Sequence, residues 1–231
     1  MRTPTPTPLP TPAPGALLFE ADPAKGLTQF CFQHSVRPIT VVTVGGRTAY
    51  RTEIRDGELI YGTERSELAN GPGACAKHRF RSGDETWTLI PVYLDSTFPA
   101  MTSWGLVTQW KVPSGGSPPS QIAIDSGGFE ILGVASESPR KQIRLMPAER
   151  GVWLNFLVHH KWSTDPAVGF VEVFVNGVQR MPRTFMRTMD NATDEMFLSV
   201  GMYRDTSNTG TAVVNIGKVR VGTTRAVVEG P

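Results

Sequence analysis

The chain has 231 residues, of which 39% are hydrophobic and 19% are charged, and its formal net charge is only +2. These values fit one large all-β domain with, at most, a short appendage. Because the basic residues are scattered along the chain, the composition argues against a nucleic-acid groove. No apolar run reaches the roughly 18 residues that a membrane helix needs, so no membrane span is expected.

The chain opens with a low-complexity segment, T-P-T-P-T-P-L-P-T-P-A-P-G, in which proline recurs at every second position up to Pro14. Proline fixes φ and removes backbone donors, so residues 1–15 are expected to form an extended, polyproline-II-like arm. Such an arm suits docking onto other structural proteins of an oligomeric assembly; the alternative is a tail without a partner. The same prolines leave no apolar region for a secretory signal.

The remaining residues, 16–231, alternate between short strand-like runs and breaks at glycine, proline and asparagine. These runs are rich in Val, Ile, Phe, Trp and Tyr, and few windows keep helical periodicity. Two packed antiparallel sheets, a β-sandwich, are therefore predicted. The expected strands are Pro38–Val44, Arg47–Ile54, Trp87–Leu94, Gly105–Val112, Gln121–Ile124, Phe129–Val134, Trp153–Trp162, Phe170–Val175, Met196–Tyr203 and Ala212–Val221.

Strand alternation predicts which side chains share a face. In the strand expected over residues 105–112, Val107, Gln109 and Lys111 fall on one face and Leu106 on the other. The clearest local turn is Asn176-Gly177, because Asn-Gly populates the positive φ angles of a type I′ hairpin.

The adjacent histidines His159 and His160 must point to opposite faces of their strand, and periodicity does not decide which of them is exposed. The chain has two cysteines, Cys31 and Cys75, which lack C-x-x-C spacing and predict neither a zinc site nor dithiol redox chemistry. One disulfide and two buried free thiols remain open alternatives.

Three short strings carry side chains suited to an acidic sugar: R-S-E-L at 65–68, Q-W-K at 109–111 and G-M-Y-R at 201–204. Arg65 can bind a carboxylate bidentately, Gln109 can hydrogen-bond one, and the phenol of Tyr203 can move a proton beside it. We expect Arg65, Gln109, Lys111 and Tyr203 to converge in one groove on the concave face of one sheet.

In this order, and together with the segment G-V-W-L-N-F-L-V-H-H-K-W-S at 151–163 and the hairpin F-V-E-V-F-V-N-G, these strings resemble a family of enzymes. The family is that of the polysaccharide lyases with a concanavalin-like jelly roll, of the heparin lyase I and glucuronan lyase type. The resemblance runs from about Phe19 to Val221, and it implies a jelly-roll fold and a polysaccharide partner.

The resemblance also implies β-elimination, in which the carboxylate of a uronic acid is neutralised, a base removes the C5 proton and an acid protonates the leaving oxygen. By matching position, Arg65 resembles the carboxylate-binding arginine, Gln109 the neutralising amide and Tyr203 the catalytic tyrosine. Two positions depart from the family pattern: Lys111 replaces a histidine, and Ser199 replaces a lysine four residues before the tyrosine.

Lys111 or Arg204 could supply the missing cation, so the candidate catalytic residues are Tyr203, Gln109, Arg65 and Lys111. The candidate glycan-binding residues are Arg65, Gln109, Lys111, His159 and Arg204.

Structural roles compete with these assignments. Arg65 and Glu67 are spaced for a salt bridge, and Tyr203 is also typical of a half-buried strand tyrosine. Trp104, with three other tryptophans, could form a sugar-stacking platform, although most tryptophans should lie in the core. No cofactor is expected; calcium could be reached by Asp84, Glu85 and Asp165, but no oxygen-ligand loop has a recognised spacing.

Two functions are therefore expected from the sequence. In the first, the domain is a glycan-binding module of a virion, a minor tail or tail-tip protein that recognises polysaccharide of the host envelope and is docked by its proline-rich arm. In the second, it is an active lyase that cleaves a uronate polysaccharide. A small jelly roll with such an arm and no secretory signal is expected of a virion component released by lysis, so the protein is expected on a virion or outside the cell.

Overall fold

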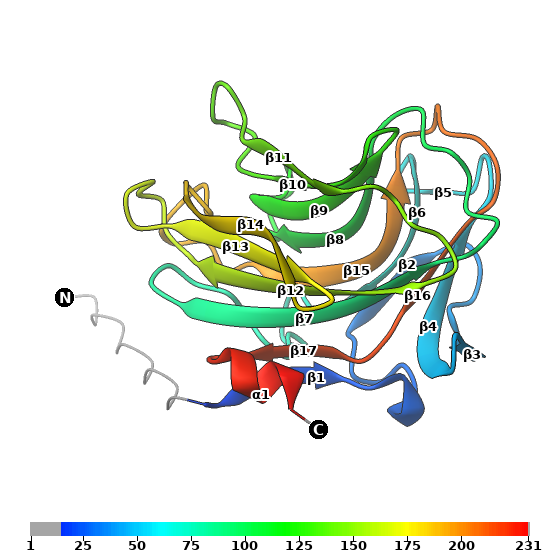
Figure 1. Cartoon of the computed structure of the whole chain (residues 1–231), viewed down its shortest axis with the longest axis horizontal. Coiled ribbons are helices and arrows are strands. Elements are labelled where there is room, and N and C mark those ends of the chain that lie inside the picture. Colours follow the sequence, from blue (N-terminus) through cyan, green and yellow to red (C-terminus); the bar gives the residue numbers. More distant parts are fainter. Residues whose placement is uncertain (1–14, 231) are drawn as a thin grey trace, which may run out of the picture.

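Two antiparallel sheets, A and B, pack face to face in the computed structural model of the chain, which describes residues 15–230 (Figure 1). The all-β, two-sheet sandwich predicted from the sequence is confirmed. The predicted arm lies outside the described residues, except for Gly15.

The sheets have nine and eight strands, respectively. In sheet A the main path runs β14 (Val178–Phe185), β13 (Phe170–Val175), β12 (Trp153–Lys161), β7 (Glu85–Leu94), β16 (Ala212–Ile216), β4 (Arg47–Ile54), β3 (Thr40–Val44), and β17 (Val219–Gly222) pairs with both β7 and β1 (Leu17–Ala21). In sheet B it runs β11 (Gln142–Met146), β10 (Gly128–Leu132), β9 (Ser120–Asp125), β8 (Gly105–Lys111), β15 (Phe197–Arg204), β6 (Thr63–Ala69), β2 (Phe32–Ser35), and β5 (Leu59–Ile60) also pairs with β6.

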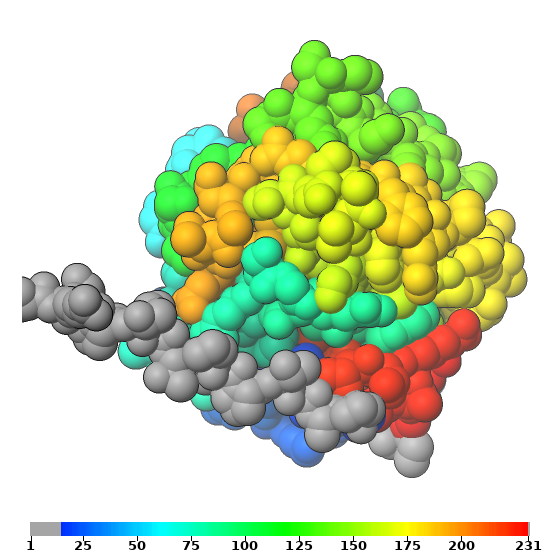
Figure 2. All heavy atoms as spheres, turned by 90° about the vertical axis from the view of Figure 1, so that its left-hand side faces the viewer, coloured from blue at the N-terminus to red at the C-terminus, as the bar shows by residue number. Residues whose placement is uncertain are grey.

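Within residues 15–230, helical structure is limited to a 3-10 turn at Pro23–Lys25 and a short helix, α1, at Arg225–Glu229. Helix α1 contacts β7 and β17 at the bottom of the view in Figure 1, and it is the red surface in Figure 2. The chain enters beside it, where the backbone N–H of Gly15 donates to Thr223 Oγ1 at 2.9 Å. None of the helices within residues 15–230 is long and apolar enough to cross a membrane.

The core fills the space between the sheets with aromatic and branched side chains, including the fully buried Trp110 and Trp162. His160 lies in this core, stacked on Trp162 and 2.9 Å from Ser120 Oγ through its Nε2. Burial lowers the pKa of His160 well below the usual histidine value, so it is neutral and structural. His159 therefore takes the opposite face of β12.

The expected strands form with small shifts at their ends, and one of them is divided. Strands β1, β2, β5, β6, β11 and β14 are not among those expected from the sequence. The single strand expected over Ala212–Val221 is two strands, β16 and β17, separated at Gly217. Both pair with β7, and between them the Gly217 N–H donates to the carbonyl of Pro91, which itself has no N–H for the ladder. Strand β14 completes the hairpin expected at Asn176-Gly177, and its Pro182 is tolerated because β14 lies at an edge of sheet A.

Cys31 and Cys75 form a disulfide with their Cα atoms 5.7 Å apart. The sequence left open one disulfide or two buried free thiols, and the structure has the disulfide. It ties the start of β2 to the loop after β6, and Cys31 N also donates to Ala69 O at 2.8 Å. The disulfide therefore fixes one edge of sheet B.

Candidate functional site

A groove of about 400 Å³ lies on sheet B and is lined by Arg65 from β6, Gln109 and Lys111 from β8, and Tyr203 from β15. Part of its floor belongs to a small apolar cluster of Leu106, Ala123 and Leu132, which is separate from the main core and packs against Tyr203. The groove is therefore on the outer face of sheet B. The structure brings together all four candidate catalytic residues.

Strand alternation in β8 is interrupted by a β-bulge between Leu106 and Thr108. The bulge turns Val107 into the main core and Leu106 into the groove, opposite to the assignment from simple alternation. Gln109 and Lys111 lie beyond the bulge and share the groove face as expected. The β-bulge thus places the apolar side chain of Leu106 in the groove beside the polar side chains of Gln109 and Lys111.

Glu67 lies beneath these side chains and links β6 to β8 across β15. Its Oε1 accepts a hydrogen bond from Gln109 Nε2 at 2.5 Å. Opposite Glu67, β15 carries Gly201. Burial raises the pKa of Glu67, while the bond from Gln109 and the charges of Arg65 and Lys111 oppose that rise. Gln109 is held in a fixed orientation by this contact.

Arg65 and Tyr203 form a stacked pair at the wall of the groove. The guanidinium of Arg65 lies 4.3 Å from the centroid of the Tyr203 ring, and Trp104 packs edge-on against the same ring at 5.0 Å. Arg65 Nε and Nη2 donate to Thr63 Oγ1 at 3.0 and 2.9 Å, and its Nη1 is 3.7 Å from Glu67. Within residues 15–230 the Tyr203 hydroxyl makes no hydrogen bond, so it is free to meet a ligand.

Two further cations line the groove. Lys111 Nζ donates to the carbonyl of Gly116 at 2.8 Å, and burial together with Arg65 lowers the pKa of Lys111. Arg140 donates through Nε to Gly133 O at 2.8 Å, and its pKa is also lowered by burial. Three cations and one buried carboxyl group therefore surround the space, which favours an anionic ligand.

His159 is not in this groove, contrary to its expected role in glycan binding. It lies in β12 of sheet A, 2.9 Å from Glu85 and 3.1 Å from Glu172, with its ring stacked 3.9 Å from that of Trp87. Because both ring nitrogens face carboxylates and both faces are covered, His159 binds β7 and β13 to β12. We correct its role to a structural one.

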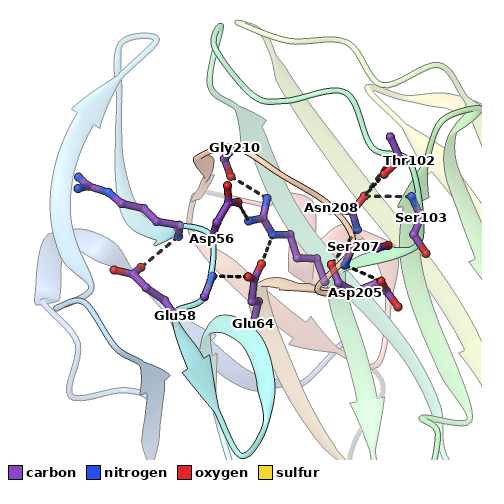
Figure 3. Close-up of polar contacts among 12 residues, drawn as sticks. Asp56, Glu58, Glu64, Thr102, Ser103, Asp205, Ser207, Asn208 and Gly210 are labelled. Atoms are coloured by element: carbon purple, nitrogen blue, oxygen red, sulfur yellow. Dashed lines mark hydrogen bonds and ion pairs between the residues drawn. The ribbon is translucent and has the colours of Figure 1, made fainter.

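Arg204 is also structural rather than glycan-binding, because its side chain is 0% exposed. Its Nε is 2.7 Å from Glu64, its Nη2 is 2.9 Å from Asp56, and its Nη1 donates to Gly210 O, as Figure 3 shows for these three partners. Period-two alternation explains the outcome, since Arg204 follows Tyr203 and points to the opposite face.

The loop that carries Trp104 is held by the buried Asn208. Its Oδ1 accepts from the backbone N–H groups of Thr102 and Ser103 at 2.9 and 3.0 Å (Figure 3). Its Nδ2 donates to Trp104 O at 3.1 Å. The tryptophan that packs against Tyr203 is thus fixed in place. Among the tryptophans considered as a platform, Trp104 alone lines the groove, whereas Trp110 and Trp162 lie in the core.

A larger cavity, of about 570 Å³, lies on sheet A beside α1. Two of its cations are already engaged, Lys218 with Asp22 at 2.8 Å and Arg47 with Asn155 at 2.8 Å. The groove on sheet B, where cations, an oriented amide and a free phenol meet, is therefore the better candidate. No group of three or more metal-ligating side chains gathers within the described part of the chain.

Sequence reasoning missed Arg140 and Gln121 as groove residues and treated Glu67 only as an ion-pair partner. Gln121 pairs directly with Gln109 across β8 and β9, a register that cannot be read from the sequence. Arg140 lies in a segment without strand periodicity, so no sequence pattern indicates its direction.

Comparison with known proteins identifies the fold and the family. An endo-β-1,4-glucuronan lyase from the fungus Trichoderma reesei superposes with a TM-score of 0.72 at 19% identity, covering 92% of this chain and 98% of its own. The alginate lyase Aly36B gives 0.62 at 10% identity, covering 88% and 91%. An alginate lyase from a Chlorella virus, vAL-1, gives 0.54 at 10% identity, covering 82% and 90%. These similarities establish the jelly-roll fold expected from the sequence.

No curated protein sequence matches the chain. The profile of the polysaccharide lyase family, however, matches residues 23–220, which is most of the molecule. The chain therefore belongs to the polysaccharide lyase family.

Proposed function

We propose that the groove on sheet B binds an acidic, uronate-containing polysaccharide. The observation that carries the proposal is the convergence of Arg65, Gln109, Lys111 and Tyr203 on one side of the sheet. Arg65 offers a guanidinium for a carboxylate, and Lys111 and Arg140 add positive charge along the same space. The apolar floor gives the C–H face of a sugar ring a surface to lie on.

Cleavage by β-elimination is a second candidate, favoured by the free hydroxyl of Tyr203 beside Arg65. In this reaction the C5–H bond of the uronate breaks, a C4=C5 double bond forms, and the C4–O bond to the leaving sugar breaks. Arg65 and Gln109 would stabilise the charge that develops on the carboxylate. Tyr203 would deliver a proton to the leaving oxygen, and it could also remove the C5 proton when both lie on one face of the sugar.

Two departures from the family pattern favour binding over catalysis. Lys111 and Ser199 stand where the family pattern has a histidine and a lysine. Ser199 is buried and pairs with Gln109, so it brings no cation to the tyrosine. Lys111 keeps a positive charge near the carboxylate, but it donates to Gly116 rather than contacting Tyr203. The groove thus retains its binding groups more completely than its proton-transfer groups.

The wider setting that we propose is a virion. The chain enters the domain on sheet A, where β1 pairs with β17, whereas the groove opens on the outer face of sheet B. Attachment through the preceding proline-rich residues would therefore leave the groove accessible to a glycan of the host envelope. Pull-down of structural partners by a chain with and without residues 1–14 tests this attachment.

The substitutions Arg65→Ala and Tyr203→Phe separate binding from cleavage. Arg65→Ala is expected to weaken retention on uronate polysaccharides about tenfold or more, because a charge-assisted bidentate contact is lost. Tyr203→Phe removes only a hydroxyl and is expected to leave retention nearly unchanged. The measurements are retention on immobilised glycans and ultraviolet absorbance of an unsaturated product.

If the wild type produces an unsaturated product and Tyr203→Phe lowers its rate by about 100-fold or more, the domain is a lyase. If the wild type is retained without forming product, it is a binding module. Failure of every uronate polysaccharide to be retained or cleaved would refute both functions.

Glu67→Gln is expected to strengthen binding of a uronate about tenfold at pH 8, because a negative charge beside the carboxylate site is removed while an acceptor for Gln109 is kept. Burial raises the pKa of Glu67 above the ordinary 4.5, so the wild type should lose affinity as the pH rises from 4.5 and Glu67 ionises. Affinity measured against pH should be flatter for Glu67→Gln in this window. A matched control is Glu172→Gln on sheet A, which should leave the wild-type profile unchanged.

A further inference from the structure

Three aromatic rings cluster on the edge of sheet B beside the groove. Phe32 and His34 come from β2, with ring centroids 5.9 Å apart and planes inclined by 16°. Tyr61 meets His34 edge-on at 5.8 Å. Phe32 is 41% exposed and Tyr61 is 80% exposed, so this aromatic platform of Phe32, His34 and Tyr61 is open to solvent.

Tyr61 occupies a backbone position that is unfavourable for tyrosine. Tyr61 and Gly62 form the two-residue turn between β5 and β6, with φ values of 53° and 75°. Such turns favour Asn-Gly, and a residue with a bulky side chain in the left-handed region costs about 1 kcal/mol or more. An exposed ring with few contacts does not recover this cost in the folded state alone. The position is therefore better explained by a ligand than by stability.

The platform lies on the same face of sheet B as the groove, next to Arg65 at its wall. His34 pairs with Glu67 and Phe32 pairs with Ala69, so both rings share the face on which Glu67 reaches Gln109. The turn that carries Tyr61 is tied to the groove through Thr63, whose hydroxyl donates to Ile60 O and accepts from Arg65. Arg65 lies two residues along β6 from Glu67, the partner of His34, so a sugar chain crossing the strands passes from Arg65 to His34 along a diagonal of about 7–8 Å.

The chemistry of the platform suits a sugar ring better than a carboxylate. Phe32 and Tyr61 are uncharged, and burial together with the charge of Arg65 lowers the pKa of His34, so its ring is neutral at neutral pH. Aromatic faces of this kind attract the weakly positive C–H groups on one face of a pyranose. The carboxylate of the same sugar can still turn towards Arg65.

We propose that Phe32, His34 and Tyr61 form a stacking subsite for a sugar residue next to the one held at Arg65, on the same acidic polysaccharide chain. The proposal rests on the proposed function of the groove and extends it past the edge of the sheet. The subsite makes the affinity depend on the length of the oligosaccharide, because only a longer one reaches both the cations and the rings.

The test uses a double variant, Phe32→Thr with Tyr61→Asn, in the full chain. Threonine suits an edge strand and asparagine suits the positive φ of the turn, so the variant should fold with unchanged or higher thermal stability. Binding of a uronate disaccharide and a uronate octasaccharide is measured by calorimetry. The double variant is expected to bind the disaccharide as the wild type does and the octasaccharide about tenfold more weakly.

Phe185→Thr is the matched control, since Phe185 is 56% exposed on β14 of sheet A. It should bind both oligosaccharides as the wild type does. Unchanged octasaccharide affinity in the double variant overturns the subsite alone, as does a wild type that binds both lengths equally well. Self-association of the wild type that the double variant loses would instead assign the platform to contact between copies. A wild type that binds neither oligosaccharide removes the proposed function of the groove, and the subsite with it.

Discussion

Gly201→Ala is expected to lower the free energy of unfolding by about 4 kcal/mol and the melting temperature by roughly 10 °C. Gly201 has a φ of +136°, which L-residues rarely adopt, and an added Cβ would lie 2.3 Å from the carbonyl oxygen of Ser66 and 3.0 Å from Glu67 Cα. These atoms belong to the backbone of β6 and cannot move without opening the β6–β15 pairing. Thermal unfolding followed by circular dichroism measures the change.

The matched control is Gly46→Ala. Gly46 has a φ of +74°, but nothing lies within 4 Å of an added Cβ, so only the backbone penalty of about 1 kcal/mol is expected. The difference between the two variants isolates the clash with β6. Equal losses of stability would contradict the close approach of β15 to β6. The surviving folded fraction of Gly201→Ala should also bind acidic glycans poorly, because Glu67 and Tyr203 flank the displaced backbone.

Much of the fold follows from local sequence patterns. Val- and Ile-rich runs broken by glycine, proline and asparagine predict strands in both sheets, since such segments must bury one face against another layer. Strands β1, β2, β5, β6 and β11 are not predicted by such runs. Partner strands also decide how proline is accommodated. Pro91 splits β16 from β17, and the edge position of β14 tolerates Pro182.

The candidate site, like the fold, is predicted only in part from the sequence. Arg65, Gln109, Lys111 and Tyr203 were found through their strings and through the family resemblance, and the structure places them together. The link from Glu67 to Gln109 could not be predicted, because it depends on which β15 residue, Gly201, separates them in space. The string G-M-Y-R, in contrast, does indicate through period-two alternation that its arginine points away from Tyr203.

The second large effect on stability is expected at the buried Arg204. Arg204→Met is expected to lower the free energy of unfolding by about 4 kcal/mol, because Glu64 would remain buried without its cation. Glu64 is 2% exposed and would keep only the hydrogen bond from Gly57 N–H at 2.7 Å, whereas Asp56, 57% exposed, would return to water. The midpoint of urea unfolding measures the loss.

Adding Glu64→Gln to Arg204→Met should recover part of this stability, since the double variant leaves no unpaired buried charge. Arg225→Met, which breaks the exposed pair with Glu229 on α1, is the control and should cost no more than about 1 kcal/mol. An Arg204→Met variant as stable as the control would mean that Glu64 is hydrated in solution. A large loss with partial rescue would instead show that Arg204 holds the hairpin of β5 and β6 against β15, and with it the turn that presents Tyr61 beside the groove.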